Sequence, residues 1–187
     1  MLPDDKELIE KYLDGDDSAF SELLDLYLKP TYNFLYRFTG NAAATDDLTQ
    51  ETFIKVWKNL KRFDRGKKFK TWLFTIAKNT AFDYLKKKKT IPFSSFTGEE
   101  DNNYLENISE DSALPDELLE KKDLAEELDG KLKQLPKQYE LILVMRYKDD
   151  FSLAEIAEIL ELPYNTVKSQ HARALAGLKK ILEDGKP

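Results

Sequence analysis

The chain lacks cysteine and has a single histidine, His171. Without cysteine there is no disulfide, no thiolate metal site and no cysteine nucleophile. One histidine leaves few pairs of nucleophile and base, and a zinc site needs several ligands grouped together. The seven glycines form no Gly-rich phosphate loop. We therefore expect no metal, no cofactor and no enzymatic activity.

Long apolar runs are also missing. No segment approaches the roughly 18–20 apolar residues that are needed to span a bilayer. The acidic N-terminal segment, residues 1–10, has no apolar stretch of the kind found in secretion signals. These absences predict a cytoplasmic protein that inserts into no membrane.

Helical periodicity recurs along the chain, and no β-alternation competes with it. Apolar stripes with helical spacing contain Phe20, Leu23, Leu24 and Tyr27, and then Phe53, Val56, Trp57 and Leu60. Pro30 is expected to end the first helix, and Thr45, Asp46 and Asp47 are expected to stand at the start of the second.

The helical period fails after residue 89, where Pro, Ser, Asn and acidic residues accumulate. We predict an all-α protein with two small helical domains, residues 1–92 and 116–187. A flexible acidic linker, residues 93–115, would join them.

Charge is distributed unevenly. Residues 61–89 hold eleven lysines and arginines against two acidic residues, whereas residues 90–130 hold thirteen acidic residues against two lysines. A basic block inside an acidic chain favours a polyanion partner at that block and a basic partner elsewhere. A solvated basic helix followed by an acidic tether is the plainer alternative.

The segment "SLAEIAEILELPYNTVKSQHARAL", residues 152–175, predicts a helix-turn-helix motif. Ser152 and Glu155 have capping-box spacing, Leu162-Pro163 breaks the short helix, and Asn165 can cap the longer one. A helical hairpin that serves only as core is the alternative. The face expected to be exposed carries groups suited to phosphates and base edges: Thr166, Lys168, Ser169, Gln170 and Arg173.

Four stretches in order resemble sigma factors of bacterial RNA polymerase, specifically the extracytoplasmic-function group of the sigma-70 family. They are "AFSELLDLYLKPTYNFLYRFTGN", "DDLTQETFIKVWKNL", "FKTWLFTIAKNTAFDYLKKKK" and "LPKQYELILVMRYKDDFSLAEIAEILELPYNTVKSQHARA". The resemblance implies a first domain that docks on core polymerase and melts the minus-ten element, and a second that reads the minus-thirty-five element. It also implies an anti-sigma factor as a partner, and a linker that threads through basic channels of the polymerase.

The resemblance assigns candidate residues to these tasks. Docking on the coiled coil of the largest polymerase subunit falls to Asp46, Asp47, Gln50 and Glu51. Minus-ten recognition and melting fall to Phe63, Lys67, Lys68, Phe69, Lys70, Trp72, Lys78, Asn79, Asp83 and Lys86. Minus-thirty-five recognition falls to Asn165, Thr166, Lys168, Ser169, Gln170 and Arg173.

Ordinary structural roles remain the alternative for several of these residues. The docking carboxylates could be capping groups on a solvated face, and Phe69 and Trp72 could be core. The chain departs from the family at Gln170, where an arginine is usual, and at His171, where a leucine is usual. His171 follows Val167 by four residues, so it is expected to pack inward or at the edge of the core.

Three other functions compete with the sigma reading. An autonomous helix-turn-helix regulator would explain residues 131–187 but not the aromatic and basic block. A metal-dependent nuclease would need a paired acidic motif, and none stands out. A protein-binding module, such as an adaptor, would tolerate charge reversal at Lys67, Lys68 and Lys70.

Overall fold

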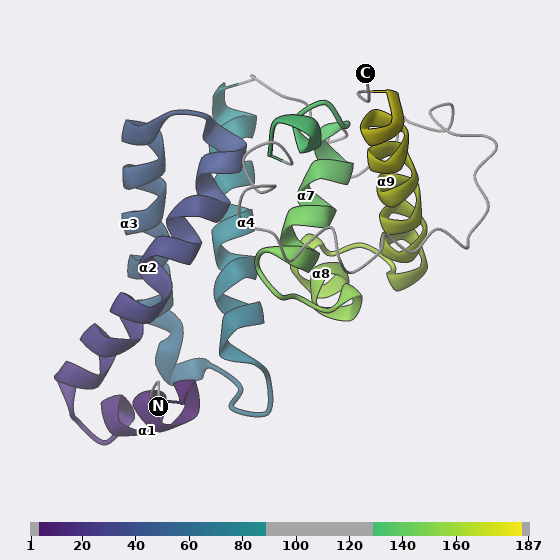
Figure 1. The fold of residues 1–187 in the computed structure, drawn as a ribbon. Helices are drawn as coiled ribbons and strands as arrows, with labels where there is room; N and C mark the ends of the chain where they lie inside the picture. The colour runs from purple at the N-terminus through teal and green to yellow at the C-terminus, as the bar shows by residue number, and fades with distance from the viewer. Residues whose placement is uncertain (1–3, 89–128, 185–187) are drawn as a thin grey trace. The chain divides into compact units, whose positions relative to one another are not determined.

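The computed structural model describes residues 4–88 and 129–184 (Figure 1). All regular structure in these residues is helical, which confirms the all-α prediction. The chain divides into unit 1, Met1–Thr90, and unit 2, Ile91–Pro187. The expected linker, residues 93–115, lies outside the described residues.

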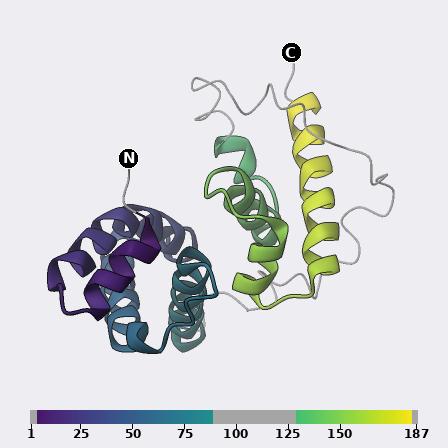
Figure 2. The ribbon, with the colours of Figure 1, turned by 90° about the horizontal axis from the view of Figure 1, so that it is seen from below.

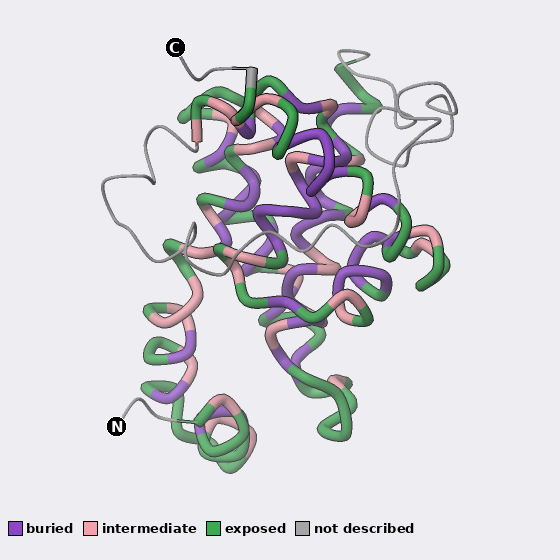
Figure 3. Tube along the Cα trace, turned by 45° about the vertical axis from the view of Figure 1, so that its right-hand side comes forward, coloured by how far each residue is buried: buried purple, intermediate pink, exposed green. Residues whose placement is uncertain are grey.

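The described residues of unit 1, 4–88, hold four α-helices and one short 3₁₀ helix. They are α1 (Asp5–Leu13), α2 (Asp17–Thr39), α3 (Ala42–Asn59), η1 (Leu60–Arg62) and α4 (Phe69–Lys88). Helices α2, α3 and α4 lie side by side, and α1 packs against α2 (Figure 1, Figure 2). The buried residues lie along the sides of the helices that face one another (Figure 3).

Helix α1 was not expected from the sequence. Asp4 accepts a hydrogen bond from the Lys6 backbone N–H and caps the helix, and Leu8 and Ile9 are buried. Tyr27 Oη donates to Asp5 Oδ2 at 2.5 Å and so ties α2 to α1. Burial and this hydrogen bond raise the pKa of the Tyr27 phenol far above its usual value.

Helix α2 continues through Pro30, so the prediction that Pro30 ends a helix was wrong. Proline removes one backbone donor but keeps a helical φ. Burial of Leu23 before it and Phe34 after it holds the two halves on one core. The helix ends at Gly40, whose positive φ of 58° lets its N–H bond to the Tyr36 carbonyl.

Helix α3 begins at Ala42, one turn earlier than expected. Asn41 caps it by accepting a hydrogen bond from Ala44 N at 2.9 Å. Asp46 and Asp47 therefore belong to the second turn, not to the helix start. Their placement there leaves both carboxylates exposed.

Unit 2 contains α7 (Lys137–Tyr147), α8 (Leu153–Leu160) and α9 (Tyr164–Asp184). Its core includes Leu132, Leu135, Tyr139, Leu143, Val144, Ala174, Leu175 and Leu178. Gly177 allows α9 to approach Leu135, because a Cβ at that position would stand 3.0 Å from Leu135 Cδ2.

The predicted capping box is present at the start of α8. Ser152 Oγ accepts from Glu155 N at 3.2 Å, and the Ser152 N–H donates to Glu155 Oε2 at 2.8 Å. The helix ends before Leu162-Pro163, because Glu161 adopts a left-handed φ of 57°. Asn165 lies inside the first turn of α9 and is not its cap, contrary to expectation.

Candidate functional site

The polar residues expected to dock on the polymerase share the exposed side of α3. Asp46, Asp47, Gln50 and Glu51 are all exposed. Ile54 and Trp57 are also exposed, by 51% and 52%, at helical spacings that continue the same side. We call these six residues the α3 face.

The sequence interpretation placed Trp57 in the apolar inner stripe, and the structure shows that this was wrong. Phe53, Val56 and Leu60 are buried, but Trp57 is turned outward. The signal was available, because Trp57 follows Gln50 by seven residues and so lies on the polar side. Ile54, four residues after Gln50, was missed for the same reason. The α3 face is therefore a mixed acidic and apolar surface.

Three aromatic rings form a cluster around the start of α4. The Phe63 ring centroid lies 4.9 Å from Trp72 and 5.8 Å from Phe69. Phe69 is buried and also contacts Tyr27, with centroids 5.4 Å apart. Phe63 and Trp72 are half-buried. Phe69 thus has the core role that was its alternative, whereas Phe63 and Trp72 keep accessible ring surface that could stack on a base.

The loop before α4 carries exposed cations beside this cluster. Lys67 and Lys68 are exposed, and Lys70 is half-buried. Asp64 shapes the loop, since its Oδ1 accepts from Gly66 N at 2.9 Å and its carbonyl accepts from Lys67 N at 3.0 Å. The loop therefore presents Lys67 and Lys68 to solvent in the segment between Phe63 and Phe69.

One side of α4 carries the remaining minus-ten candidates. Asn79, Asp83 and Lys86 are exposed and spaced four and three residues apart, in line with Trp72. We call Trp72, Asn79, Asp83 and Lys86 the α4 face.

Lys78 was expected to contact a phosphate, but it is not exposed to solvent. Its side chain is buried, and its ammonium lies 5.5 Å from the centroid of the Phe82 ring. A cation held inside the unit over an aromatic ring contributes to packing and to a cation–π contact. We therefore leave Lys78 out of the DNA surface.

The exposed side of α9 in unit 2 carries Asn165, Lys168, Ser169 and Arg173, and Thr166 is half-buried at its edge. Ser169 Oγ donates to the Thr166 carbonyl at 3.0 Å. Tyr164, which is 49% exposed at the start of α9, was not expected and extends this surface. These residues offer the amide, hydroxyl and cationic groups that read grooves and phosphates.

Gln170 was expected on the recognition surface, but only 5% of this residue is exposed. It follows the buried Val167 by three residues and precedes the buried Ala174 by four, so helical geometry turns it inward. That spacing was readable from the sequence. Gln170 belongs to the packing of α9 and not to its exposed side.

His171 stands at the edge of the unit 2 core, as expected. Its Nε2 lies 3.2 Å from Tyr147 Oη, and the two rings stack with centroids 5.8 Å apart. Burial and the nearby Arg146 guanidinium lower the pKa of the His171 imidazole. The ring is therefore neutral at pH 7, where it can share a hydrogen bond with Tyr147.

This lowered pKa predicts a loss of stability in mild acid. The unfolded chain binds a proton near pH 6.5, whereas folded unit 2 takes it up only at lower pH, so stability should fall as the pH drops below about 6.5. His171→Gln should flatten this fall while changing stability little at pH 8. Urea unfolding at pH 8, 6.5 and 5 measures the effect, and parallel curves for the two proteins would contradict it.

Within the described residues, no three His, Cys, Asp or Glu side chains are grouped as a metal site requires. No helix in that part of the chain has both the length and the apolar composition to cross a membrane.

Comparison with known families identifies the class of protein. Sigma-70 region 2 matches residues 23–91, and Sigma-70 region 4 matches residues 125–178. The chain is 35% identical over 181 residues to the ECF RNA polymerase sigma factor SigW of Bacillus subtilis, covering 96% of this chain and 97% of that protein. The chain belongs to the sigma-70 family, in its extracytoplasmic-function (ECF) group.

Two solved structures have a similar fold. CnrH, solved in complex with the cytosolic domain of CnrY, is 22% identical with a TM-score of 0.65, over 97% of this chain and 99% of that one. RpoE of Bartonella quintana, solved with the anti-sigma factor NepR, is 22% identical with a TM-score of 0.61, over 89% and 98%.

Proposed function

We propose that this chain is a promoter-specificity subunit that binds bacterial core RNA polymerase and directs it to a set of promoters, recognising and melting their DNA. The observation that carries the proposal is the ordered pair of family matches, region 2 on residues 23–91 and region 4 on residues 125–178. The chain itself is not an enzyme, since RNA synthesis belongs to the polymerase. It would act in the cytoplasm, where core RNA polymerase and promoter DNA are found.

Docking is assigned to the α3 face. Asp46, Asp47 and Glu51 would attract cationic groups of the largest-subunit coiled coil, with Gln50 as a hydrogen-bonding neighbour. Ile54 and Trp57 would supply the apolar contact, because an exposed tryptophan gains most when a partner excludes water from it. Helix α3 would thus supply both the ionic attraction and the apolar contact of the docking interface.

Minus-ten recognition and melting are assigned to the α4 face and the loop before it. Lys67, Lys68 and Lys86 would neutralise phosphates, with the half-buried Lys70 at the margin. Phe63 and Trp72 would receive unpaired bases, and stacking contributes about 1–3 kcal/mol per base. Asn79, with Asp83, could read the edge of an extruded base.

Minus-thirty-five recognition is assigned to α9, the second helix of the helix-turn-helix. Asn165, Ser169 and Arg173 can read base edges in a major groove, while Lys168 contacts phosphate. We further propose the domain limits 1–92 and 116–187, with residues 93–115 as the tether.

An anti-sigma factor is a further proposed partner, and it would act by covering the α3 face or the DNA surfaces. An autonomous helix-turn-helix regulator is the second candidate. It is not favoured, because it uses α8 and α9 but leaves the region 2 match on residues 23–91 without a role.

Run-off transcription tests the proposal directly. Core polymerase from the source organism is combined with its genomic promoter fragments, with and without the full chain. We expect discrete new transcripts only when the chain is present. Unchanged transcription, together with tight site-specific binding of the free protein to duplex DNA, would refute the proposal in favour of the autonomous regulator.

A further inference from the structure

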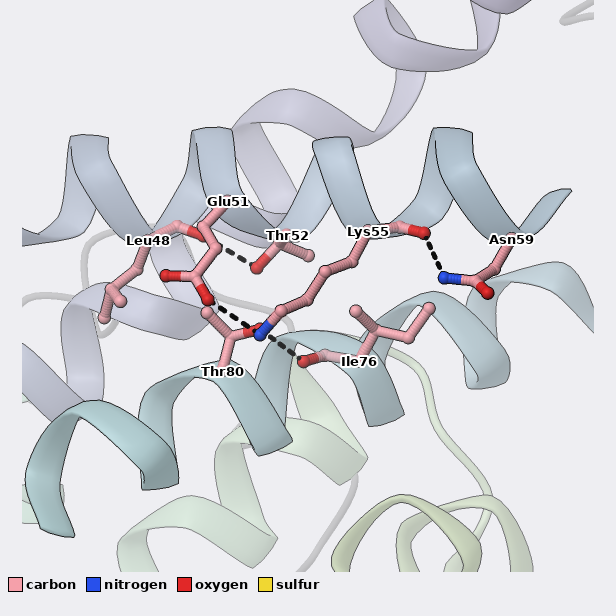
Figure 4. A network of polar contacts seen from close by, with 7 residues as sticks. All are labelled: Leu48, Glu51, Thr52, Lys55, Asn59, Ile76 and Thr80. Carbon is pink, nitrogen blue, oxygen red and sulfur yellow. Dashed lines mark hydrogen bonds and ion pairs between the residues drawn. The ribbon is translucent and has the colours of Figure 1, made fainter.

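A chain of polar contacts links α3 to α4 between the two proposed surfaces of unit 1 (Figure 4). Lys55 Nζ lies 2.8 Å from Glu51 Oε1 and 3.0 Å from Thr80 Oγ1. Thr80 Oγ1 lies 2.9 Å from the Ile76 carbonyl oxygen. Glu51 belongs to the α3 face, and Thr80 directly follows Asn79 of the α4 face.

The donors in this chain are fixed by chemistry. An ammonium can only donate, so Thr80 Oγ1 accepts from Lys55 and gives its own proton to the Ile76 carbonyl. Thr80 is 1% exposed and the Lys55–Thr80 bond is part-buried, and a hydrogen bond partly shielded from water is stronger than one fully in solvent. The Lys55–Glu51 pair is 37% and 52% exposed in its side chains and contributes little by itself. The Lys55–Thr80 hydrogen bond, and not the ion pair within α3, is therefore the contact that links α3 to α4.

Neighbouring hydroxyls on α3 do not form such a link. Thr49 and Thr52 are buried, but they donate to carbonyls of their own helix, those of Thr45 and Leu48, each at 2.7 Å. The hydrophobic effect is non-directional, whereas a hydrogen bond requires two particular atoms to meet. A directed bond from Lys55 to Thr80 can fix how far α4 is shifted along α3.

We propose that Lys55 is a positioning residue that couples polymerase docking on the α3 face to DNA recognition on the α4 face. Through Glu51 it orders a docking carboxylate, and through Thr80 it fixes the helix that carries Asn79. The docked polymerase then holds the DNA-reading side chains at a defined place. The inference rests on the proposed function and assigns a role to a residue in neither proposed surface.

A pair of matched variants isolates the bond. Thr80→Val removes the acceptor of Lys55 with little change of shape, and Thr80→Ser keeps it. Thr52→Val is the control, because it deletes a buried threonine hydroxyl that bonds only within its own helix. The full-length variants are combined with core polymerase, and two quantities are measured: the Kd for core, and the half-life of open promoter complexes after heparin challenge.

We expect Thr80→Val to shorten the open-complex half-life by roughly 3-fold to 10-fold, with the Kd for core within about twofold of the original. Thr80→Ser should restore the half-life, and Thr52→Val should change neither quantity. In a Lys55→Met background, Thr80→Val should have no further effect. A simple packing role for Thr80 would not produce that dependence on Lys55.

Two results would overturn the inference: equal half-lives for Thr80→Val and Thr52→Val, or the same shortening in the Lys55→Met background. If Thr80→Val unfolds, Lys55→Arg and Lys55→Met replace it, and equal half-lives for those two would overturn it as well. Failure of the unmodified chain to direct any transcript would instead refute the proposed function, so the two failures are distinguishable.

Discussion

Reversing two charges in the loop before α4, with Lys67→Glu and Lys68→Glu, is expected to abolish promoter-specific transcription while leaving affinity for core polymerase nearly unchanged. Both lysines are exposed in the loop that precedes α4, and neither belongs to the α3 face. Reversal removes two cations that would neutralise phosphates and places two anions against the DNA. Transcript yield should fall roughly 100-fold, and the salt slope of promoter binding should flatten by about 2.

The control for this variant is Lys6→Glu with Lys29→Glu, two exposed lysines on α1 and α2 of the same unit. It makes the same change in net charge, so it separates a local effect from a general loss of attraction to DNA. Holoenzyme formation is measured by titration with core polymerase, and transcription by run-off. An equal loss of transcripts in both variants would contradict a DNA surface at Lys67 and Lys68, and so would full activity of the first variant.

Local rules predicted local structure well. The capping box of Ser152 and Glu155 forms as expected, because both partners lie within one helical turn and need nothing from the rest of the chain. The helix-turn-helix order of α8 and α9 follows from the same kind of signal. The all-α class also follows, since the 3.6-residue period is a property of each segment alone.

Where tertiary packing competes with a local rule, the sequence misled. Pro30 ends a helix in isolation, but here apolar residues on both sides are buried in one core and carry α2 through it. Helix α1 was overlooked because its acidic residues concealed two buried ones, Leu8 and Ile9. Their burial depends on α2, which a local pattern does not include.

Residue type alone did not predict the orientation of the candidate side chains. Lysine and glutamine suit DNA, yet Lys78 and Gln170 are turned inward, and the position of each on its helix decides this, not its chemistry. The prediction for Trp57 was wrong in the opposite direction, because this aromatic residue was assigned to the core and is exposed. In all three helices, α3, α4 and α9, the period of the buried neighbours is a better guide to orientation than the polarity of the residue.

Trp57→Ala is expected to weaken binding to core polymerase about 30-fold or more while leaving the fold of unit 1 intact. The side chain is 52% exposed, so its removal takes little from the core of the unit. In an interface the same ring would be covered, and truncation of a central tryptophan typically costs 2 kcal/mol or more, about 30-fold in Kd. Titration of labelled core polymerase measures the Kd, and thermal unfolding checks the fold.

Matched truncations on another helix test whether the α3 face is specific. Leu28→Ala and Tyr36→Ala remove comparable side chains on α2, which are 50% and 45% exposed, and both should leave the Kd for core unchanged. Because Trp57→Ala impairs docking alone, a high concentration of that variant should restore transcription, whereas the Lys67→Glu, Lys68→Glu variant should stay inactive at any concentration. An unchanged Kd for Trp57→Ala, or an equal loss in the α2 variants, would show that polymerase does not dock through this face.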